Sequence, residues 1–414
     1  MNILFVCRYN RFRSRIALAY FNKINKNKNI KAKSAGLIKG NPLSPFTIGI
    51  AKAFGLDISN LSLKIAMLKK KGRFFDLASW GETEIKPGTI EEGEIKDQDA
   101  FVKIIKEGIK NVKGKKLKTK NVVVSLPEKE AFLEVIQMPK MDQEELKSAI
   151  PYEAENYIPL PIEKVYLDFQ IISPVKNHLD HLDVLITAFP KKTIDSYVSC
   201  LKKAGLIPYA LEIESQSIVR ALIKNGVSPS PIFIIDFGRT NTRFIIFSGY
   251  SLRFTSSIPI SSQKLTEDIS QNLKIDLKEA EKLKIKHGLQ FLKKKNNDGK
   301  DKKISEAMTP ALTELAEQIK KYVDYYQTHV THEHLAPNGK MVDKVLLCGR
   351  GANLKGFEDF LSSSLGILTE RANPWVNILP KPPKEVRGLS FQESLGFTTA
   401  LGLAIRGIRE NKQL

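Results

Sequence analysis

Apolar runs along this chain are interrupted by short polar turns, and two of these interruptions share one pattern. They lie at residues 55–65 and 234–244, far apart in the sequence. In each, an apolar run ends at an aspartate, Asp57 or Asp236, small and hydroxyl-bearing residues follow, and an apolar run then resumes. Short apolar runs separated by turn residues predict strands, so each segment predicts a β-hairpin with an acidic residue just before its turn.

The chemistry of these two predicted turns suits a phosphate group. Backbone N–H groups and hydroxyls donate hydrogen bonds to phosphate oxygens, while an aspartate holds a magnesium ion or its waters. A third turn, glycine-rich and at residues 349–353, follows an apolar strand predicted at 345–347. Two hairpins and a glycine-rich strand end predict two halves of the protein that close on one nucleotide.

Strands alternate with helices along most of the chain, which predicts an α/β fold. After a strand at 122–124, we expect a helix at 144–157, a strand at 184–189 and a helix at 191–204 that ends at Gly205. These elements predict an α+β insert of roughly 85 residues, because alternating elements of this length form one small packed unit.

Composition and charge narrow the function classes. No apolar run reaches the roughly 18 residues that a membrane span needs. Three widely spaced cysteines favour a reducing cytoplasm over a disulfide framework. The net charge of +20 could favour binding to nucleic acid or to an anionic membrane surface. No helix-turn-helix, zinc finger or basic stretch interleaved with aromatic residues is present, so no nucleic-acid partner is predicted.

The first 53 residues carry a different pattern. A strand predicted at 2–6 ends at Cys7, and Arg13 and Ser14 open a helix predicted at 15–22. A thiolate at a helix N-terminus is stabilised by the helix dipole, and an arginine can fork onto a bound phosphate. This is the chemistry of a cysteine-dependent phosphatase, in which Cys7 would take the phosphoryl group.

This segment resembles the low-molecular-weight protein tyrosine phosphatases up to about residue 60, and its catalytic residues would be Cys7, Arg13 and Ser14. It departs from them at Tyr9, where glycine is usual, and no Asp-Pro general acid follows. Loss of the acid costs roughly 10²–10⁴-fold in rate, so we expect phosphate binding without turnover. The resemblance gives way near residues 54–60, which indicates a chimera of a truncated phosphatase-like segment and a second protein.

From residue 54 onward the chain resembles the PilM family of type IV pilus assembly proteins, and more distantly the cell-division protein FtsA. Matching stretches lie at 55–68, 85–95 and 136–141, and the most diagnostic is IPYEAENYIPLPIEKVYLD at 150–168. The resemblance implies an actin-like α/β ATPase fold with an inserted α+β subdomain. The implied divisions are residues 1–53, 54–120, 121–206 and 207–414.

The resemblance also implies the ligands. ATP and magnesium are the expected cofactors, with at most weak ATPase activity, and Asp57 and Asp236 are the expected magnesium residues, through water. Glu281 and Lys284, on one face of a predicted helix, would meet the ribose and adenine. Arg350 stands where the family usually has glycine and would either point outward or crowd the adenine. The full predicted nucleotide site is Asp57, Ser59, Asn60, Ser62, Lys64, Asp236, Gly238, Thr240, Thr242, Glu281, Lys284, Gly349 and Gly351.

The expected partner is the short cytoplasmic N-terminus of the inner-membrane protein PilN, together with other inner-membrane pilus assembly proteins. The chain would therefore be cytoplasmic, peripheral to the inner membrane through its partners, and its oligomeric state stays open. Two alternatives remain: a low-molecular-weight phosphatase and an FtsA-like filament-forming scaffold. The stretch at 394–409 lacks the charged amphipathic end by which FtsA lies on membranes, which favours PilM.

Overall fold

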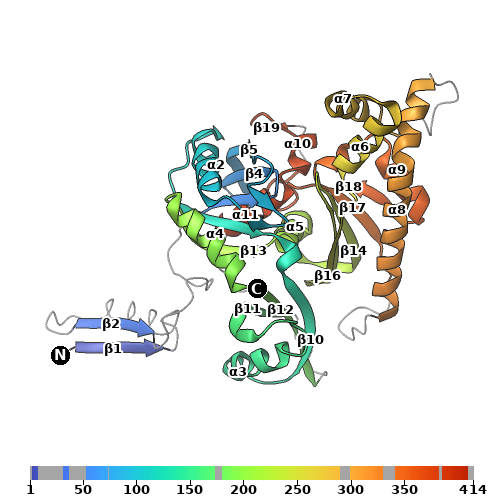
Figure 1. Ribbon diagram of the computed structural model, residues 1–414. Coiled ribbons are helices and arrows are strands. Elements are labelled where there is room, and N and C mark those ends of the chain that lie inside the picture. Colours follow the sequence, from blue (N-terminus) through green and yellow to red (C-terminus); the bar gives the residue numbers. More distant parts are fainter. Residues whose placement is uncertain are drawn as a thin grey trace.

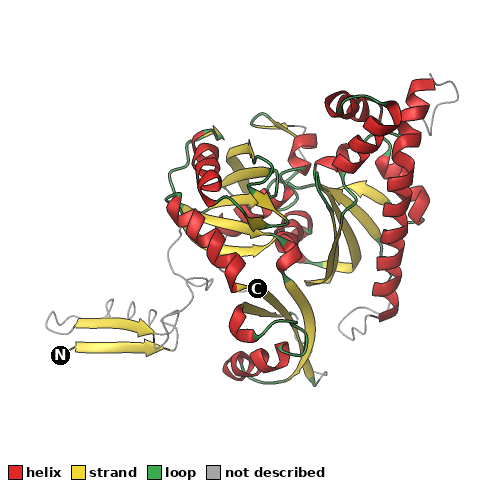
Figure 2. Cartoon of the chain, viewed as in Figure 1, coloured by secondary structure: helices red, strands yellow, loops and turns green. Residues whose placement is uncertain are grey.

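The computed structural model describes residues 2–7, 31–36, 53–72, 74–172, 180–289, 299–329, 341–381 and 385–408. From residue 53 onward these residues form two lobes, each built on one large β-sheet, and a smaller inserted sheet (Figures 1 and 2). We define the first lobe by a six-stranded sheet and the second lobe by a five-stranded sheet.

The six-stranded sheet of the first lobe has the strand order β13-β9-β3-β4-β5-β8. Its strands are β3 (Phe54–Ile58), β4 (Ser62–Lys71), β5 (Phe74–Glu84), β8 (Lys113–Gly114), β9 (Asn121–Leu126) and β13 (Ile207–Ile213). Side chains alternate along β3, as expected for a strand that is covered on both faces. Phe54, Leu56 and Ile58 pack with α2 (Gln98–Lys110) and α4 (Lys191–Lys203), and Gly55 faces α11 (Thr398–Ile408) on the other side.

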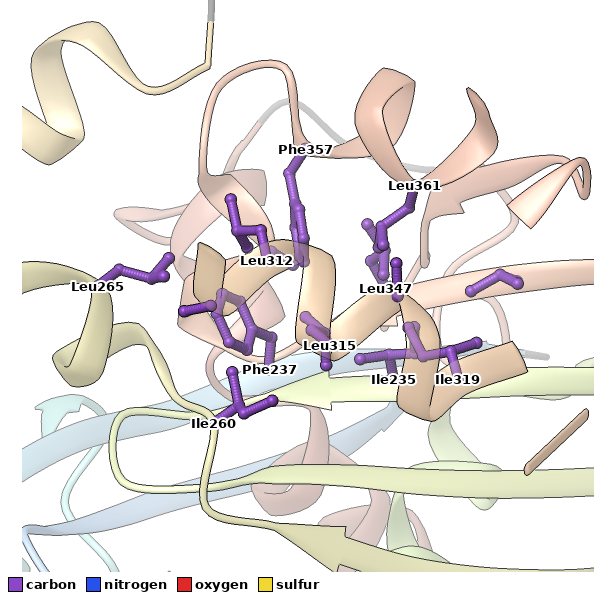
Figure 3. Packing of buried hydrophobic residues seen from close by; sticks show 14 of the residues in the cluster. Ile235, Phe237, Ile260, Leu265, Leu312, Leu315, Ile319, Leu347, Phe357 and Leu361 are labelled. Atoms are coloured by element: carbon purple, nitrogen blue, oxygen red, sulfur yellow. The ribbon is translucent and has the colours of Figure 1, made fainter. Parts of the chain in front are cut away.

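The five-stranded sheet of the second lobe has the order β16-β15-β14-β17-β18. Its strands are β14 (Ser228–Phe237), β15 (Thr242–Gly249), β16 (Ser251–Ile258), β17 (Lys344–Cys348) and β18 (Thr369–Arg371). One face is covered by α6 (Ser262–Leu273), α7 (Leu277–His287), α8 (Gly299–His329) and α9 (Phe357–Leu365). An apolar stripe of α8 that includes Leu312, Leu315 and Ile319 packs over Ile235 and Leu347 in this core (Figure 3).

The two sheets share one topology. In each, three antiparallel strands in sequence (β3-β4-β5 or β14-β15-β16) are followed by two strands parallel to the first (β9 and β13, or β17 and β18). The first strand of each set therefore lies inside its sheet. Its carboxyl end and the hairpin turn that follows occupy equivalent places in the two lobes, which is where Asp57 and Asp236 lie.

Two helices lie between the sheets. Helix α5 (Glu214–Leu222) packs its Ile218 and Val219 against Ile234 and Ile245 of the second lobe. It also contacts α11, which covers the first sheet and is buried along almost its whole length. Because α11 returns the end of the chain to the first lobe, the two lobes are joined by more than one pass of the backbone.

The inserted subdomain is smaller than the predicted range of 121–206. Its sheet has the order β10-β12-β11 (Phe132–Pro139, His181–Pro190, Val165–Ile171), with α3 (Gln143–Ala154) against it around a separate core. Strand β9 instead pairs with β3 and β13, and α4 packs on the first sheet. The apolar Val122–Val124 run that marked the start of the insert is buried in the first lobe because it is a central strand there.

Shorter elements complete the described residues. They are β6 (Ile90–Glu91), β7 (Glu94–Ile95), β19 (Glu385–Val386), β20 (Leu389–Ser390), α10 (Phe391–Leu395) and the 3₁₀ turns η1 (Glu128–Glu130), η2 (Ile162–Lys164), η3 (Lys224–Gly226) and η5 (Arg350–Asn353).

Among residues 1–52, β1 (Asn2–Cys7) and β2 (Lys31–Gly36) pair in parallel. The predicted strand ending at Cys7 is present, whereas Arg13, Ser14 and the predicted helix lie outside the described residues. No described helix is both long enough and apolar enough to cross a membrane.

Glycines let α11 approach the elements beneath it. A Cβ atom on Gly402 would lie 1.8 Å from the backbone oxygen of Ser217 in α5. We predict that Gly402→Ala lowers the free energy of unfolding by roughly 3 kcal/mol or more, because backbone cannot yield as a flexible side chain does. Chemical denaturation with circular dichroism measures the change.

The matched control is Gly396→Ala. Gly396 has φ −75° and its added Cβ would meet its nearest neighbours at 3.4 and 3.5 Å. This change should leave stability within roughly 1 kcal/mol of the parent chain. Equal stabilities for the two variants would contradict the close packing of α11 on α5.

Candidate functional site

The two hairpin aspartates occupy equivalent places at the ends of the first strand of each lobe. Asp57 lies in β3 and is 5% exposed, and Asp236 lies near the end of β14. Burial raises the pKa of Asp57 and the negative charge of Asp236 adds to the rise, whereas Lys64 acts in the opposite direction. That the two aspartates serve one ligand stays a prediction.

The predicted glycine-rich turn lies directly on the second hairpin. A Cβ atom on Gly349 would lie 2.5 Å from Oδ1 of Asp236, and one on Gly351 would lie 2.5 Å from Cδ1 of Phe237. Gly349 also has φ +78°, a conformation that favours glycine. Only glycine at both positions allows this approach, so these two residues form part of the same junction as Asp236.

The first hairpin turn is tight and rich in hydroxyls. The backbone N–H of Ser59 donates to the carbonyl of Ser62 at 2.9 Å, and the two Oγ atoms are 3.0 Å apart. Asn60 Oδ1 accepts a hydrogen bond from the backbone N–H of Gly93 at 3.2 Å, so its carbonyl oxygen holds a neighbouring loop. Lys64, opposite Asp57 in the hairpin register, places Nζ 3.8 Å from Asp57 Oδ2.

The second turn is closed by the backbone N–H of Gly238, which donates to the carbonyl of Asn241 at 3.0 Å. Thr240 is exposed at the turn, where its hydroxyl can meet a ligand. Thr242 is fully buried and its hydroxyl donates to the carbonyl of Ile260 at 2.5 Å. Of the two predicted threonines, only Thr240 therefore lies at the surface of the turn.

Glu281 and Lys284 share a face of α7, as their spacing predicts. Lys284 Nζ is 2.7 Å from Glu281 Oε2 and also donates to the carbonyl of Ser262 at 2.6 Å and the hydroxyl of Thr266 at 2.7 Å. Burial lowers the pKa of Lys284 although Glu281 opposes the change. The lysine thus ties α7 to α6, whereas the Glu281 side chain is 45% exposed and is the member of the pair that a ligand could contact.

Three residues at the junction were not predicted: Glu128, Glu214 and Arg243. Arg243 lies opposite Asp236 in the second hairpin, and its Nη1 is 2.5 Å from Asp236 Oδ2. Its Nη2 donates to Glu214 at the start of α5. Its Nε lies 2.9 Å from Oε2 of Glu128, close enough for an ion pair but not aligned for a hydrogen bond. One guanidinium therefore joins the second hairpin to Glu128, which follows β9 of the first lobe, and to Glu214 at the start of α5 between the sheets.

These charges are removed from water. Arg243, Glu128 and Glu214 are 6%, 9% and 6% exposed. Burial, together with neighbouring carboxylates, raises the pKa of Glu214 to about 8, even though Arg243 acts in the opposite direction. An arginine inside an otherwise apolar strand was the available sequence signal, because an unpaired buried guanidinium is too costly to occur without acidic partners.

The residues at the junction do not fit a magnesium ion held by Asp57 and Asp236. Lys64 and Arg243 already stand beside these carboxylates, and Ser125 Oγ donates to Asp57 Oδ1 at 3.1 Å. Over the residues that the structure describes, no group of three or more His, Cys, Asp or Glu side chains is arranged to hold a metal ion. The magnesium assignment therefore stays a prediction that this side-chain arrangement does not favour.

Exposed ion pairs cross the junction near its surface. Arg350 of η5 places Nη2 2.6 Å from Oε2 of Glu82, and Nη1 of Arg239 lies 4.0 Å from Oε1 of Glu84. Both glutamates belong to β5 of the first lobe. Arg350 thus reaches across to the other lobe, with its side chain 59% exposed. Exposed pairs of this kind contribute roughly 0–1 kcal/mol each, so they leave the lobes free to adjust.

The fold and the site can now be compared with known proteins. A family model described as type IV pilus assembly protein PilM matches residues 55–408. A solved structure, the PilM-PilN type IV pilus biogenesis complex, aligns with a TM-score of 0.72 and 25% identity over 87% of this chain and 100% of that chain.

Curated relatives include the cell division protein FtsA of Enterococcus hirae, 24% identical over 56% of this chain and 57% of that protein. FtsA of Streptococcus pneumoniae is also 24% identical, over 56% of this chain and 55% of that protein. The chain thus spans a little over half the length of these curated relatives. They do not support the phosphatase-like interpretation of residues 1–53, all of which lie outside the family match.

The predicted fold class, an actin-like α/β fold with an inserted subdomain, is confirmed by this alignment and these relatives. The family match covers most of the chain, including both hairpins, the insert and the glycine-rich turn. The chain belongs to the type IV pilus assembly protein PilM family.

Proposed function

We propose that this chain is a nucleotide-binding component of type IV pilus assembly that binds the cytoplasmic N-terminus of PilN. The observation that carries the nucleotide half is the pair of equivalent hairpins, one in each lobe, whose aspartates Asp57 and Asp236 occupy matching places in the two sheets. The two turns and the Gly349–Gly351 segment would together offer the backbone N–H groups and hydroxyls that bind phosphates.

ATP is the proposed nucleotide. Ser59, Ser62 and Thr240 would bind phosphate oxygens, and Lys64 would add a positive charge beside them. Glu281 would face the ribose from α7. Because the turns belong to different lobes, a bound nucleotide would hold the two lobes at a defined angle and so favour one arrangement of the molecule over others.

The partner half of the proposal rests on family membership and on the alignment with a PilM chain from a PilM-PilN complex. All of that chain is covered, so no element of its fold lacks a counterpart here. The chain would act in the cytoplasm at the inner membrane, held there by PilN and other pilus assembly proteins. Nucleotide binding would tune the PilN-binding surface through the angle between the lobes.

Lys64→Met tests the nucleotide site. The substitution keeps the length of the side chain but removes its charge beside Asp57, so we predict ATP binding at least roughly tenfold weaker by isothermal titration calorimetry. Lys69→Met is the matched control, because Lys69 lies on the same strand and pairs with Asp76 at 3.0 Å, outside the junction. Equal affinities in both variants would place the nucleotide elsewhere.

A PilN peptide tests the partner. We predict that a labelled peptide of the cytoplasmic N-terminus of PilN from the same organism binds with a micromolar dissociation constant, about −8 kcal/mol, by fluorescence anisotropy. A scrambled peptide is the control. A chain that starts at residue 53 should bind equally well, because the family match begins at residue 55. Binding that requires residues 1–52, or no binding to the native peptide, would contradict the proposal.

A further inference from the structure

The two hairpins share a feature beyond their aspartates. In each, a basic residue stands opposite the aspartate in the strand register: Lys64 opposite Asp57, and Arg243 opposite Asp236. Opposite residues of an antiparallel pair lie roughly 5 Å apart at their Cβ atoms, so opposite charges there attract directly. The duplicated topology has thus placed a fixed cation beside each of the two carboxylates.

The two cations are placed differently. Lys64 Nζ stays 3.8 Å from Asp57, at the edge of ion-pair contact, with its side chain 15% exposed. The guanidinium of Arg243 lies among three carboxylates, those of Asp236, Glu214 and Glu128, with its side chain 7% exposed. Arg243 is therefore the central positive charge of the junction, and rotation of any one carboxylate side chain leaves it paired with the other two.

A divalent cation bound by Asp236 would compete with Arg243 for the same carboxylate. Magnesium takes carboxylate oxygens and waters at about 2.0–2.1 Å in octahedral geometry. Here a guanidinium fills the space between the oxygens, and a second positive charge a few ångströms away would be repelled strongly where water is excluded. A planar group with several N–H donors also holds carboxylates at fixed angles, which a lysine cannot do.

We propose that in this chain the guanidinium of Arg243 takes the place of a divalent cation, neutralising the carboxylates of the junction so that nucleotide phosphates enter without metal. The second part rests on the proposed nucleotide function. The first part does not, because it concerns only which positive charge sits among Asp236, Glu214 and Glu128. Arg243 is a positioning residue here: it acts on the carboxylates and touches no reacting atom.

The first experiment measures metal binding to the full chain without nucleotide. Mn²⁺ is the probe, followed by electron paramagnetic resonance. We expect no bound Mn²⁺ for the parent chain at millimolar metal and one bound ion for Arg243→Met, in which the carboxylates lose their cation. Arg243→Lys should stay metal-free. A bound ion in the parent chain, or none in Arg243→Met, would overturn the proposal.

Unpaired buried carboxylates destabilise a protein, so a second measurement tests whether Arg243→Met is folded and binds metal in its folded state. Thermal unfolding with and without Mn²⁺ should show a rise in midpoint on adding metal for Arg243→Met only, since a ligand that binds the folded state stabilises it. The control is Arg253→Met, which removes a buried arginine that pairs with the single carboxylate of Asp183 at 3.3 Å. A metal response in the control equal to that of Arg243→Met would contradict a specific role for Arg243.

The second experiment measures ATP binding by calorimetry in excess EDTA and in excess Mg²⁺. The parent chain should bind with the same affinity within roughly twofold, whereas Arg243→Met should bind at least about tenfold more weakly in EDTA than in Mg²⁺. Parent binding that appears only with Mg²⁺ would overturn the inference and leave the nucleotide function standing. Parent binding in neither condition would overturn both.

Discussion

The buried ion network around Arg243 is the interaction on which the arrangement of the two lobes depends. Its members come from four separate places: η1, the start of α5, and the two strands of the second hairpin. Each charge is tolerated away from water only because the others are present, since an isolated buried ion costs several kcal/mol. The network therefore fixes the second hairpin against η1 and the start of α5, and removal of Arg243 leaves three buried carboxyl groups without their cation.

Two closely packed helices lie beside this network. Helices α5 and α11 fill the space between the sheets, and α11 comes close to α5 because Gly402 carries no side chain. A second buried pairing holds the same region: Glu212 of β13 accepts from Arg220 of α5 and Arg406 of α11. Burial alone would raise the pKa of Glu212, but the two arginines outweigh it and lower the pKa. Rigid backbone packing and buried charge thus act together at the base of the junction, while the exposed pairs Arg350–Glu82 and Arg239–Glu84 link the lobes near the surface.

Much of this architecture follows from the sequence because its signals are local. An aspartate between an apolar run and a polar turn predicts a hairpin. Gly349 and Gly351 predict that the backbone there lies close to a neighbouring element, although they do not identify that element. Helix α7, which carries Glu281 and Lys284, likewise has residue types that favour its ends, with Asp276 at the N-cap and Gly288 at the C-cap. The predicted range of the insert was too long. The apolar sequence of a buried strand such as β9 does not show which of two sheets the strand belongs to.

Side-chain direction and long-range partners were not predictable in the same way. Thr242 and Asn60 fit a phosphate turn by residue type, yet their oxygen atoms hold Ile260 and Gly93. Glu128 and Glu214 are more than 80 residues apart in the chain and reach Arg243 only through the folded sheets. The local sequence does not identify these partners. A charged arginine within an apolar strand indicates only that Arg243 must have acidic partners somewhere in the fold.

If one nucleotide is held by equivalent turns of both lobes, its phosphates will slow exchange of the backbone N–H groups in those turns. Hydrogen–deuterium exchange of the full chain, with and without ATP, measures this. We expect ATP to protect three segments together: residues 59–62, residues 238–241 and residues 349–351. Protection of only one turn, or of none of them under conditions where ATP binds, would contradict it.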